Sequence, residues 1–194
     1  MKIQQLQKIQ APLWTSAMAA EALDVKPASA RLACHRYVKG GYLVRLKRDL
    51  YATKDNWQRF RQEDIFMAAN RLQIPSYISL TSALSYYQIT SQVLQGFVES
   101  VAATRSWDHR VEGIQFKYMK FPAALYGGFI KNDSFFIATP EKAFLDALYL
   151  MAIGRYHLDL SAVDAEKLDP KKLTRQSKTF PGKIRKRMET LWKR

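Results

Sequence analysis

Between residues 26 and 48 the chain intersperses basic side chains with small and polar ones, a pattern suited to contact with nucleic acid. Arg donates two parallel hydrogen bonds to the edge of a guanine, and both Lys and Arg neutralise phosphates. Small side chains near the start of a helix let its backbone lie close against a major groove. The candidate DNA-binding residues are Lys26, Ala28, Ser29, Arg31, His35, Arg36, Lys39, Arg45, Lys47 and Arg48.

The densest positive cluster of the chain lies in residues 182–194. The spacing of Ile184, Met188 and Leu191 predicts an amphipathic helix here. A basic amphipathic helix binds nucleic acid, a membrane surface or an acidic partner, and its apolar stripe fits docking on its own domain equally well. The candidate residues of this basic surface are Lys183, Arg185, Lys186 and Arg187.

The distribution of charge favours a polyanionic partner. Of the net charge of +14, residues 1–60 contribute +7 (11 Lys and Arg, 4 Asp and Glu), residues 166–194 contribute +8 (11 and 3), and residues 61–165 contribute −1 (9 and 10). Basic segments attract nucleic acid with an affinity that falls as salt rises, because bound Lys and Arg release counterions. The alternative for the tail is a solvated charge run.

Metal, cofactor and phosphate-loop chemistry lack the residues that they need. Histidine occurs only at positions 35, 109 and 157 and cysteine only at 34, which supplies neither a metal site nor a disulfide. The eight glycines form no phosphate-binding loop. We therefore expect no cofactor and no bound metal.

A basic protein can cleave the nucleic acid that it binds, so metal-dependent DNA cleavage is the enzymatic activity to weigh. Such cleavage needs converging carboxylates. The acidic candidates are Glu99, Asp108 and Glu112, and the sequence suggests no supporting lysine at close strand spacing. We expect a protein that is not an enzyme. Only the fold can show whether residues distant in sequence converge.

Three helices and a hairpin are expected to position the first group of residues. Thr15 and Pro27 are typical of helix starts, and Asp24 tolerates the left-handed backbone of a tight turn between helices. The expected elements are helices at about 2–9, 16–23 and 27–39, ended by Gly40-Gly41, and strands at 42–46 and 50–53 with a basic tip. This order predicts a winged helix-turn-helix DNA-binding domain in residues 1–56. The alternative is a winged helix that only docks proteins.

After a polar break at 54–57, residues 57–194 predict a small mixed α/β domain that ends in the basic helix. The fold class is therefore α+β, with an N-terminal winged helix-turn-helix. The expected elements are a helix at 62–72, a segment at 75–87 that turns helical near Ser79, strands at 97–104 and 114–121, a strand pair turning at Asn132-Asp133, and a helix capped by Thr139.

Composition predicts a soluble cytoplasmic protein. Hydrophobic residues make up 47% of the chain, and no stretch reaches the roughly 18 consecutive apolar residues of a membrane span. The first residues are polar and lack a secretory signal, and the single cysteine suits a reducing compartment. We expect no membrane partner.

Three stretches resemble the AbiEi-type antitoxins of abortive-infection toxin–antitoxin systems, a family also described as predicted regulators of viral defence. Residues 41–51 look like the family's wing, 75–87 like its central segment and 138–149 like its late helix. Two departures stand out. Asp49 occupies a position where the family often has glycine, and Tyr87-Gln88 replaces a frequent His-Gly.

The resemblance implies an N-terminal domain that binds repeats in its own promoter and represses it. It further implies a C-terminal domain that neutralises a cognate nucleotidyltransferase-like toxin, by contact or functionally. Repeats can be occupied by two monomers side by side, so we expect a monomer or a weak dimer. The alternative function is a stand-alone winged-helix transcription factor whose C-terminal domain senses a ligand or partner.

Overall fold

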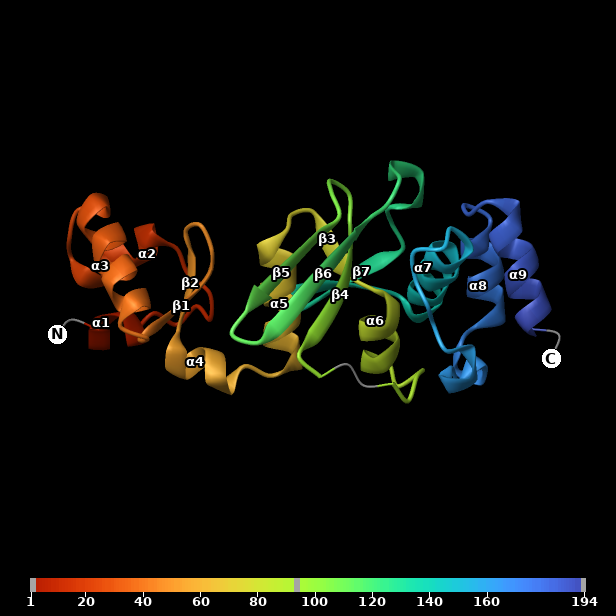
Figure 1. The fold of residues 1–194 in the computed structure, drawn as a ribbon, viewed down its shortest axis with the longest axis horizontal. Helices are drawn as coiled ribbons and strands as arrows, with labels where there is room; N and C mark the ends of the chain where they lie inside the picture. Colours follow the sequence, from red (N-terminus) through yellow and green to blue (C-terminus); the bar gives the residue numbers. More distant parts are fainter. Residues whose placement is uncertain (1–2, 93–94, 193–194) are drawn as a thin grey trace. The chain divides into compact units, whose positions relative to one another are not determined.

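The computed structural model describes residues 3–92 and 95–192, with the side chains of residues 187, 189, 191 and 192 outside the described part. The chain divides into two compact units, Met1–Ala68 and Ala69–Arg194, coloured by sequence in Figure 1. Helices and strands occur in both units, which confirms the expected mixture of α and β structure. The boundary that we expected after residue 56 falls inside a helix.

Over its described residues, the first unit runs from three helices through an antiparallel hairpin to a short helix. The bounds are α1 (Ile3–Gln7), α2 (Ser16–Leu23), α3 (Pro27–Lys39), β1 (Leu43–Lys47), β2 (Leu50–Thr53) and α4 (Lys54–Arg59). Helix α5 (Gln62–Leu72) crosses into the second unit.

The local signals in the first unit act as expected. The Thr15 hydroxyl accepts a hydrogen bond from the Met18 backbone N–H and so caps α2. Asp24 ends α2 with a φ of 52°, in the left-handed region that Asp tolerates, and Pro27 occupies the first turn of α3. The expected polar break at 54–57 is wrong: Thr53 accepts from the Asn56 N–H and starts α4.

The core of the first unit lies between its helices and the hairpin. Leu6, Ala30 and Cys34 are fully buried there. The segment before α2 also pairs with β2, because Trp14 and Tyr51 exchange backbone hydrogen bonds of 3.0 and 2.9 Å. This bridge, which the sequence did not predict, ties the hairpin to the chain that leads into α2.

The second unit contains a mixed sheet that, over the described residues, has the strand order β5-β6-β4-β3-β8-β7. Strand β3 is antiparallel to β4 and parallel to β8, and β4 is parallel to β6. The bounds are β3 (Ser76–Ile78), α6 (Leu80–Tyr86), β4 (Phe97–Ala102), β5 (Trp107–Val111), β6 (Ile114–Lys120), β7 (Phe129–Asn132) and β8 (Phe135–Ala138). The extended-to-helical segment at 75–87 and the turn at Asp133, with a φ of 44°, are confirmed. Strand β5 was not predicted.

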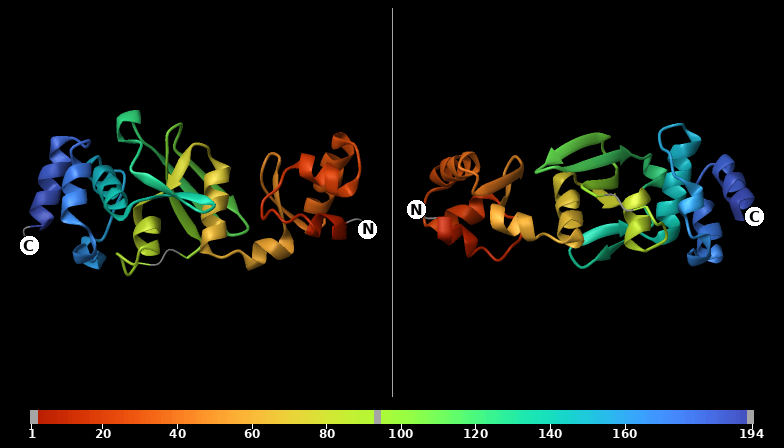
Figure 2. Two further views of the ribbon diagram at one scale, coloured as in Figure 1. Left: turned by 180° about the vertical axis from the view of Figure 1, so that it is seen from behind. Right: turned by 60° about the horizontal axis from the view of Figure 1, so that its bottom comes forward.

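Three helices complete the described part of the second unit: α7 (Pro140–Ala152), α8 (Pro170–Ser177) and α9 (Gly182–Trp192). Thr139 caps α7 by accepting from the Lys142 N–H, as expected. The three helices pack on one another, as both views of Figure 2 show. Short 3-10 turns lie at Ala123–Leu125, Leu160–Ala162 and Ala165–Lys167. Among the described helices, none has the length and apolar character needed to cross a membrane.

Candidate nucleic-acid interface

Helix α3 is held against the core of the first unit along one side only. Ala30 and Cys34 are fully buried, and Ala33, Tyr37 and Val38 pack partly against the same core. This packing fixes which side of the helix faces solvent. The exposed side contains no acidic residue, because the helix sequence from Pro27 to Lys39 has none.

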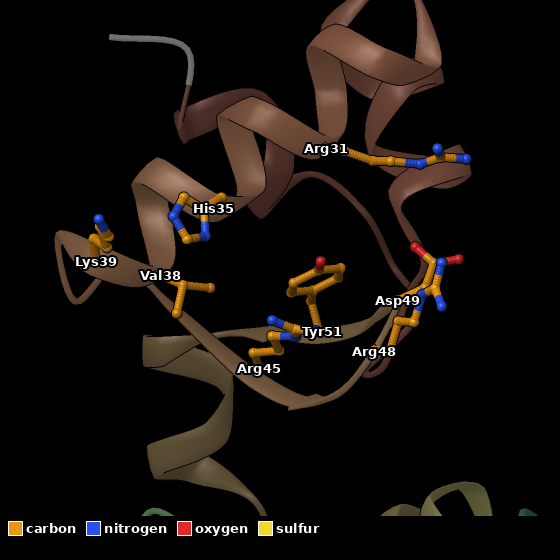
Figure 3. Close-up of a pocket in the computed structure, with 8 residues that line it drawn as sticks. All are labelled: Arg31, His35, Val38, Lys39, Arg45, Arg48, Asp49 and Tyr51. Atoms are coloured by element: carbon orange, nitrogen blue, oxygen red, sulfur yellow. The ribbon is translucent and has the colours of Figure 1, made fainter.

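A groove of about 480 Å³ lies between α3 and the hairpin. We call it the α3–hairpin groove. Figure 3 shows side chains from α3 on one side of it and side chains from β1, the turn and β2 on the other. Its lining residues are Arg31, His35, Val38, Lys39, Arg45, Arg48, Asp49 and Tyr51.

The groove brings together half of the ten DNA-binding residues that we predicted: Arg31, His35, Lys39, Arg45 and Arg48. Lys26, Ala28, Ser29 and Arg36 are exposed at or on α3 outside the groove. Across residues 3–92 and 95–192, Arg36 forms no ion pair that would hold it on the protein. Four cationic side chains and one histidine thus converge on one concave surface, which suits a polyanion.

Lys47 is set apart from the other cations of the hairpin. The pairing of β1 with β2 is irregular between Arg45 and Lys47, and Arg45 Nε donates to the Lys47 carbonyl over 3.3 Å. Lys47 is half-buried, and burial lowers its pKa below the usual value. Lys47 is not among the residues that line the groove, although the next residue, Arg48, is.

Asp49 is the acidic member of the groove, and its role was not predicted. It adopts a φ of 58°, so Asp occupies a turn conformation that glycine takes freely. Its Oδ1 accepts a hydrogen bond of 2.8 Å from the Ser16 N–H, at the start of α2. The hydrogen bonds from Ser16, aided by Arg31 and Arg48, lower the pKa of Asp49. Asp49 thus anchors the hairpin turn to α2.

Tyr51 lines the groove and Cys34 of α3 is buried in the core, and neither is a reactive group. Burial, the largest cause, raises the pKa of both, to about 11 for the Cys34 thiol. Cys34 is fully buried on the inner side of α3. A protonated, inaccessible thiol is a poor nucleophile, so Cys34 acts as a small core residue.

The predicted basic surface near the C-terminus lies on α9. Lys183, Arg185 and Lys186 are exposed, while the side chain of Arg187 lies outside the described part. Ile184 and Met188 are buried, which confirms docking of the apolar stripe on the same unit. The preceding helix α8 adds exposed cations that we did not single out, although its amphipathic spacing signals them: Lys171, Lys172 and Arg175.

Residues 75–87 and 138–149 of the second unit meet in a buried polar cluster. Asp146 on α7 accepts from Ser79 over 2.8 Å and from the Tyr77 hydroxyl over 3.1 Å, and it pairs with Lys142. Lys142 Nζ also donates to Tyr77 and lies 5.3 Å from three ring centroids, those of Tyr77, Phe121 and Phe180. The cluster is enclosed, so its role is to join elements.

Burial dominates the titration of this cluster. It raises the pKa of the Asp146 carboxyl, an effect that Lys142, Ser79 and Tyr77 oppose by donating hydrogen bonds. It also lowers the pKa of Lys142, which Asp146 opposes. Lys142 and Asp146 stabilise each other's burial, because an unpaired charge in the interior is costly.

The suggested absence of a lysine near the nuclease candidates is wrong. Lys117 on β6 lies opposite both Glu99 on β4 and Asp108 on β5, in one row across the sheet. The backbones of Glu99 and Asp108 are two strand spacings apart in this row, roughly 10 Å.

Glu99 is moreover engaged by the protein itself. Its Oε2 accepts from the Tyr156 hydroxyl over 2.7 Å and from the Thr81 N–H over 3.1 Å. Burial raises the pKa of Glu99. Within the described residues, no group of three or more His, Cys, Asp or Glu side chains is placed to hold a metal ion.

No protein-family model matches the sequence, and no curated protein matches it significantly.

Proposed function

We propose that this protein is a DNA-binding transcriptional autorepressor with a winged helix-turn-helix in its first unit, and that it serves as the antitoxin of a toxin–antitoxin system. The observation that supports DNA binding is the α3–hairpin groove, where Arg31, Lys39, Arg45 and Arg48 surround one concave surface. In this proposal α3 enters the major groove and the hairpin contacts the adjacent backbone.

The geometry of α3 suits this role. Its exposed side combines short side chains at Ala28 and Ser29 with basic ones that follow, so the helix can approach base edges before long side chains interfere. Lys26 and Arg36 extend the positive surface beyond the groove. Charge without nearby acids on the same helix makes the surface attractive to phosphate.

The antitoxin part rests on the family resemblance of segments 75–87 and 138–149. Both segments contribute to the buried cluster of Tyr77, Ser79, Lys142 and Asp146 and so belong to one part of the second unit. The exposed cations of α8 and α9 are the candidate surface for the nucleotidyltransferase-like toxin or its nucleic-acid substrate.

A stand-alone transcription factor that senses a ligand is the second candidate. A shallow pocket of about 450 Å³ along β5 and β6 favours it, because Trp107, Lys117 and Arg155 line it beside other polar groups. A toxin reading frame next to the gene distinguishes the two candidates, since only an antitoxin requires one.

A reporter fused to the DNA upstream of the gene tests repression. The full chain should lower expression, and Arg31→Ala should restore it, whereas Arg110→Ala, an exposed arginine of the second unit, should repress like the wild type. Unchanged expression with the full chain contradicts the repressor.

Co-expression of this protein with the neighbouring toxin should rescue growth. Growth arrest despite normal accumulation of this protein contradicts the antitoxin part.

A further inference from the structure

Leu32 is exposed on the side of α3 that faces solvent. Its side chain is 66% exposed, although Leu is among the residue types most often buried. It belongs neither to the core of the first unit nor to the lining of the α3–hairpin groove. An apolar side chain therefore stands among basic and polar ones on this helix.

Helix geometry places Leu32 near the centre of the exposed arc. Successive residues of an α-helix are rotated by about 100°, so Ala28, Leu32, His35 and Lys39 form its middle strip. Ala30 and Cys34 are fully buried on the opposite side, which fixes this rotation. Residues 28 and 29, one turn earlier, are too short to cover the leucine. A duplex that receives α3 meets Leu32 near the middle of the contact.

The chemistry of the major groove limits what Leu32 can contact favourably. Base edges there present hydrogen-bond donors and acceptors, and the 5-methyl group of thymine is the apolar exception. Leucine forms no hydrogen bond, so covering a donor or acceptor leaves that group unsatisfied. Covering a methyl group removes apolar surface from water on both sides.

Resting on the proposed DNA-binding function, we infer that Leu32 determines sequence specificity by packing against the 5-methyl group of a thymine. The recognised ligand is then a B-form duplex with thymine at a fixed position under the centre of α3. Neighbouring Arg31 and Arg36 contact guanine edges or phosphates on either side.

Selection from a random duplex library with the full chain, followed by replacement of each thymine by uracil, tests this inference. Uracil keeps the hydrogen-bonding edge of thymine and lacks only the methyl group. We expect the wild type to lose about fourfold in Kd at one or two thymines, the value of one buried methyl.

The Leu32→Ala variant should bind the thymine duplex more weakly and should lose less than about 1.5-fold on the same uracil replacement, because the coupled partner is gone. Ile74→Ala is the matched control, since Ile74 is 69% exposed and belongs to the second unit. It should respond to uracil as the wild type does. The exposure of Leu32 lets the alanine variant fold normally.

The outcomes distinguish failure of the inferred role of Leu32 from failure of the proposed DNA binding. An enriched sequence whose thymines all tolerate uracil, or an equal uracil effect in Leu32→Ala, overturns the role of Leu32 and leaves DNA binding intact. A library from which the full chain enriches no sequence overturns the proposed function, and the inference with it.

Discussion

The two units place their charged side chains in opposite ways. In the first unit the buried polar side chains of the described residues are the hydroxyls of Ser16 and Thr53, and the cations around α3 stay at the surface. In the second unit Glu99, Lys142 and Asp146 are buried and bonded to hydroxyl groups. Exposed charges contribute little to folding and remain available to a ligand, whereas a buried pair is costly to break. The charges around α3 are thus available for the proposed binding, whereas Glu99, Lys142 and Asp146 serve the structure of the second unit.

Breaking the buried pair should give the largest effect on stability. Asp146→Ala leaves Lys142 without its carboxylate and should lower the free energy of unfolding by about 3–5 kcal/mol. Chemical unfolding measures the loss, and hydrogen exchange should assign it to amides of β3 and α7. Replacing both partners, as Lys142→Met with Asp146→Leu, should restore part of the stability. A loss below about 1 kcal/mol for Asp146→Ala would show that burial of the pair is unimportant.

Removing an exposed cation of α3 should affect binding instead of folding. Arg31→Ala should weaken binding to the preferred DNA by about 1–3 kcal/mol if Arg31 contacts a base, with little loss on random DNA. Its thermal midpoint should stay close to that of the wild type, because the side chain is exposed. Titration against both DNAs checks the prediction, and equal losses on the two would contradict the assignment of Arg31 to base contact.

Asp49 is a charged residue of the first unit that stabilises the fold, because its carboxylate accepts a hydrogen bond from the Ser16 N–H. Asp49→Gly keeps the turn accessible and removes the acceptor for the Ser16 N–H, so it should cost about 1 kcal/mol at neutral pH. Because the folded state lowers the pKa of Asp49, this contribution is present above the unfolded value of about 3.9 and is lost as the pH falls through the folded value. The difference from wild type should shrink in acid.

Asp49→Asn is the matched control for that measurement. It keeps the shape of the side chain and a residue type that tolerates left-handed backbone, and it removes only the charge. Its stability relative to Asp49→Gly should be independent of pH. A pH-independent difference between wild type and Asp49→Asn would instead show that ionisation of Asp49 is not involved.

Lys47 provides the contrast to Arg31 within the first unit. Lys47→Ala should weaken binding to all DNA sequences alike and should reduce the magnitude of the salt slope by about one, because a phosphate contact releases one counterion. Titrations at several salt concentrations on the preferred and a shuffled duplex test this. Selective loss on the preferred duplex would assign base contact to Lys47.

The smallest effect is expected for a glycine substitution at an exposed turn of the second unit. Gln88 adopts a φ of 57° where the resembling family often has glycine. Gln88→Gly should change the free energy of unfolding by less than about 0.5 kcal/mol, because relief of the left-handed conformation is offset by entropy. Gln88→Val should lose about 1–2 kcal/mol, since a branched side chain fits this conformation poorly. Equal stability of the two variants would contradict the backbone explanation.

Local structure was largely predictable, because its signals are short-range. Thr15, Asp24, Pro27 and Thr139 act where their side chains and backbone preferences place them. Strand β5 was missed because Asp108, His109 and Arg110 are consecutive polar residues, so the sequence of this edge strand lacks the alternation of apolar and polar residues.

The long-range features were not predictable. Lys142 and Asp146 are four residues apart on α7 and resemble an exposed helical pair. They are buried because β3 and the segment after α8 cover them, as the positions of Tyr77 and Phe180 show. Two residues of the α3–hairpin groove, Asp49 and Tyr51, were not predicted for the same reason. Their long-range hydrogen bonds with Ser16 and Trp14 are formed only in the fold.

A binding titration of the full chain against its own upstream DNA and a shuffled duplex, repeated at several salt concentrations and with Arg31→Ala, tests the central claim most directly. The proposed function predicts tighter binding of the upstream DNA, a salt-dependent affinity for both duplexes, and loss of the preference in the variant. Equal binding of both duplexes by the wild type would mean that the basic surfaces hold polyanions without reading sequence, and would contradict the proposed repressor.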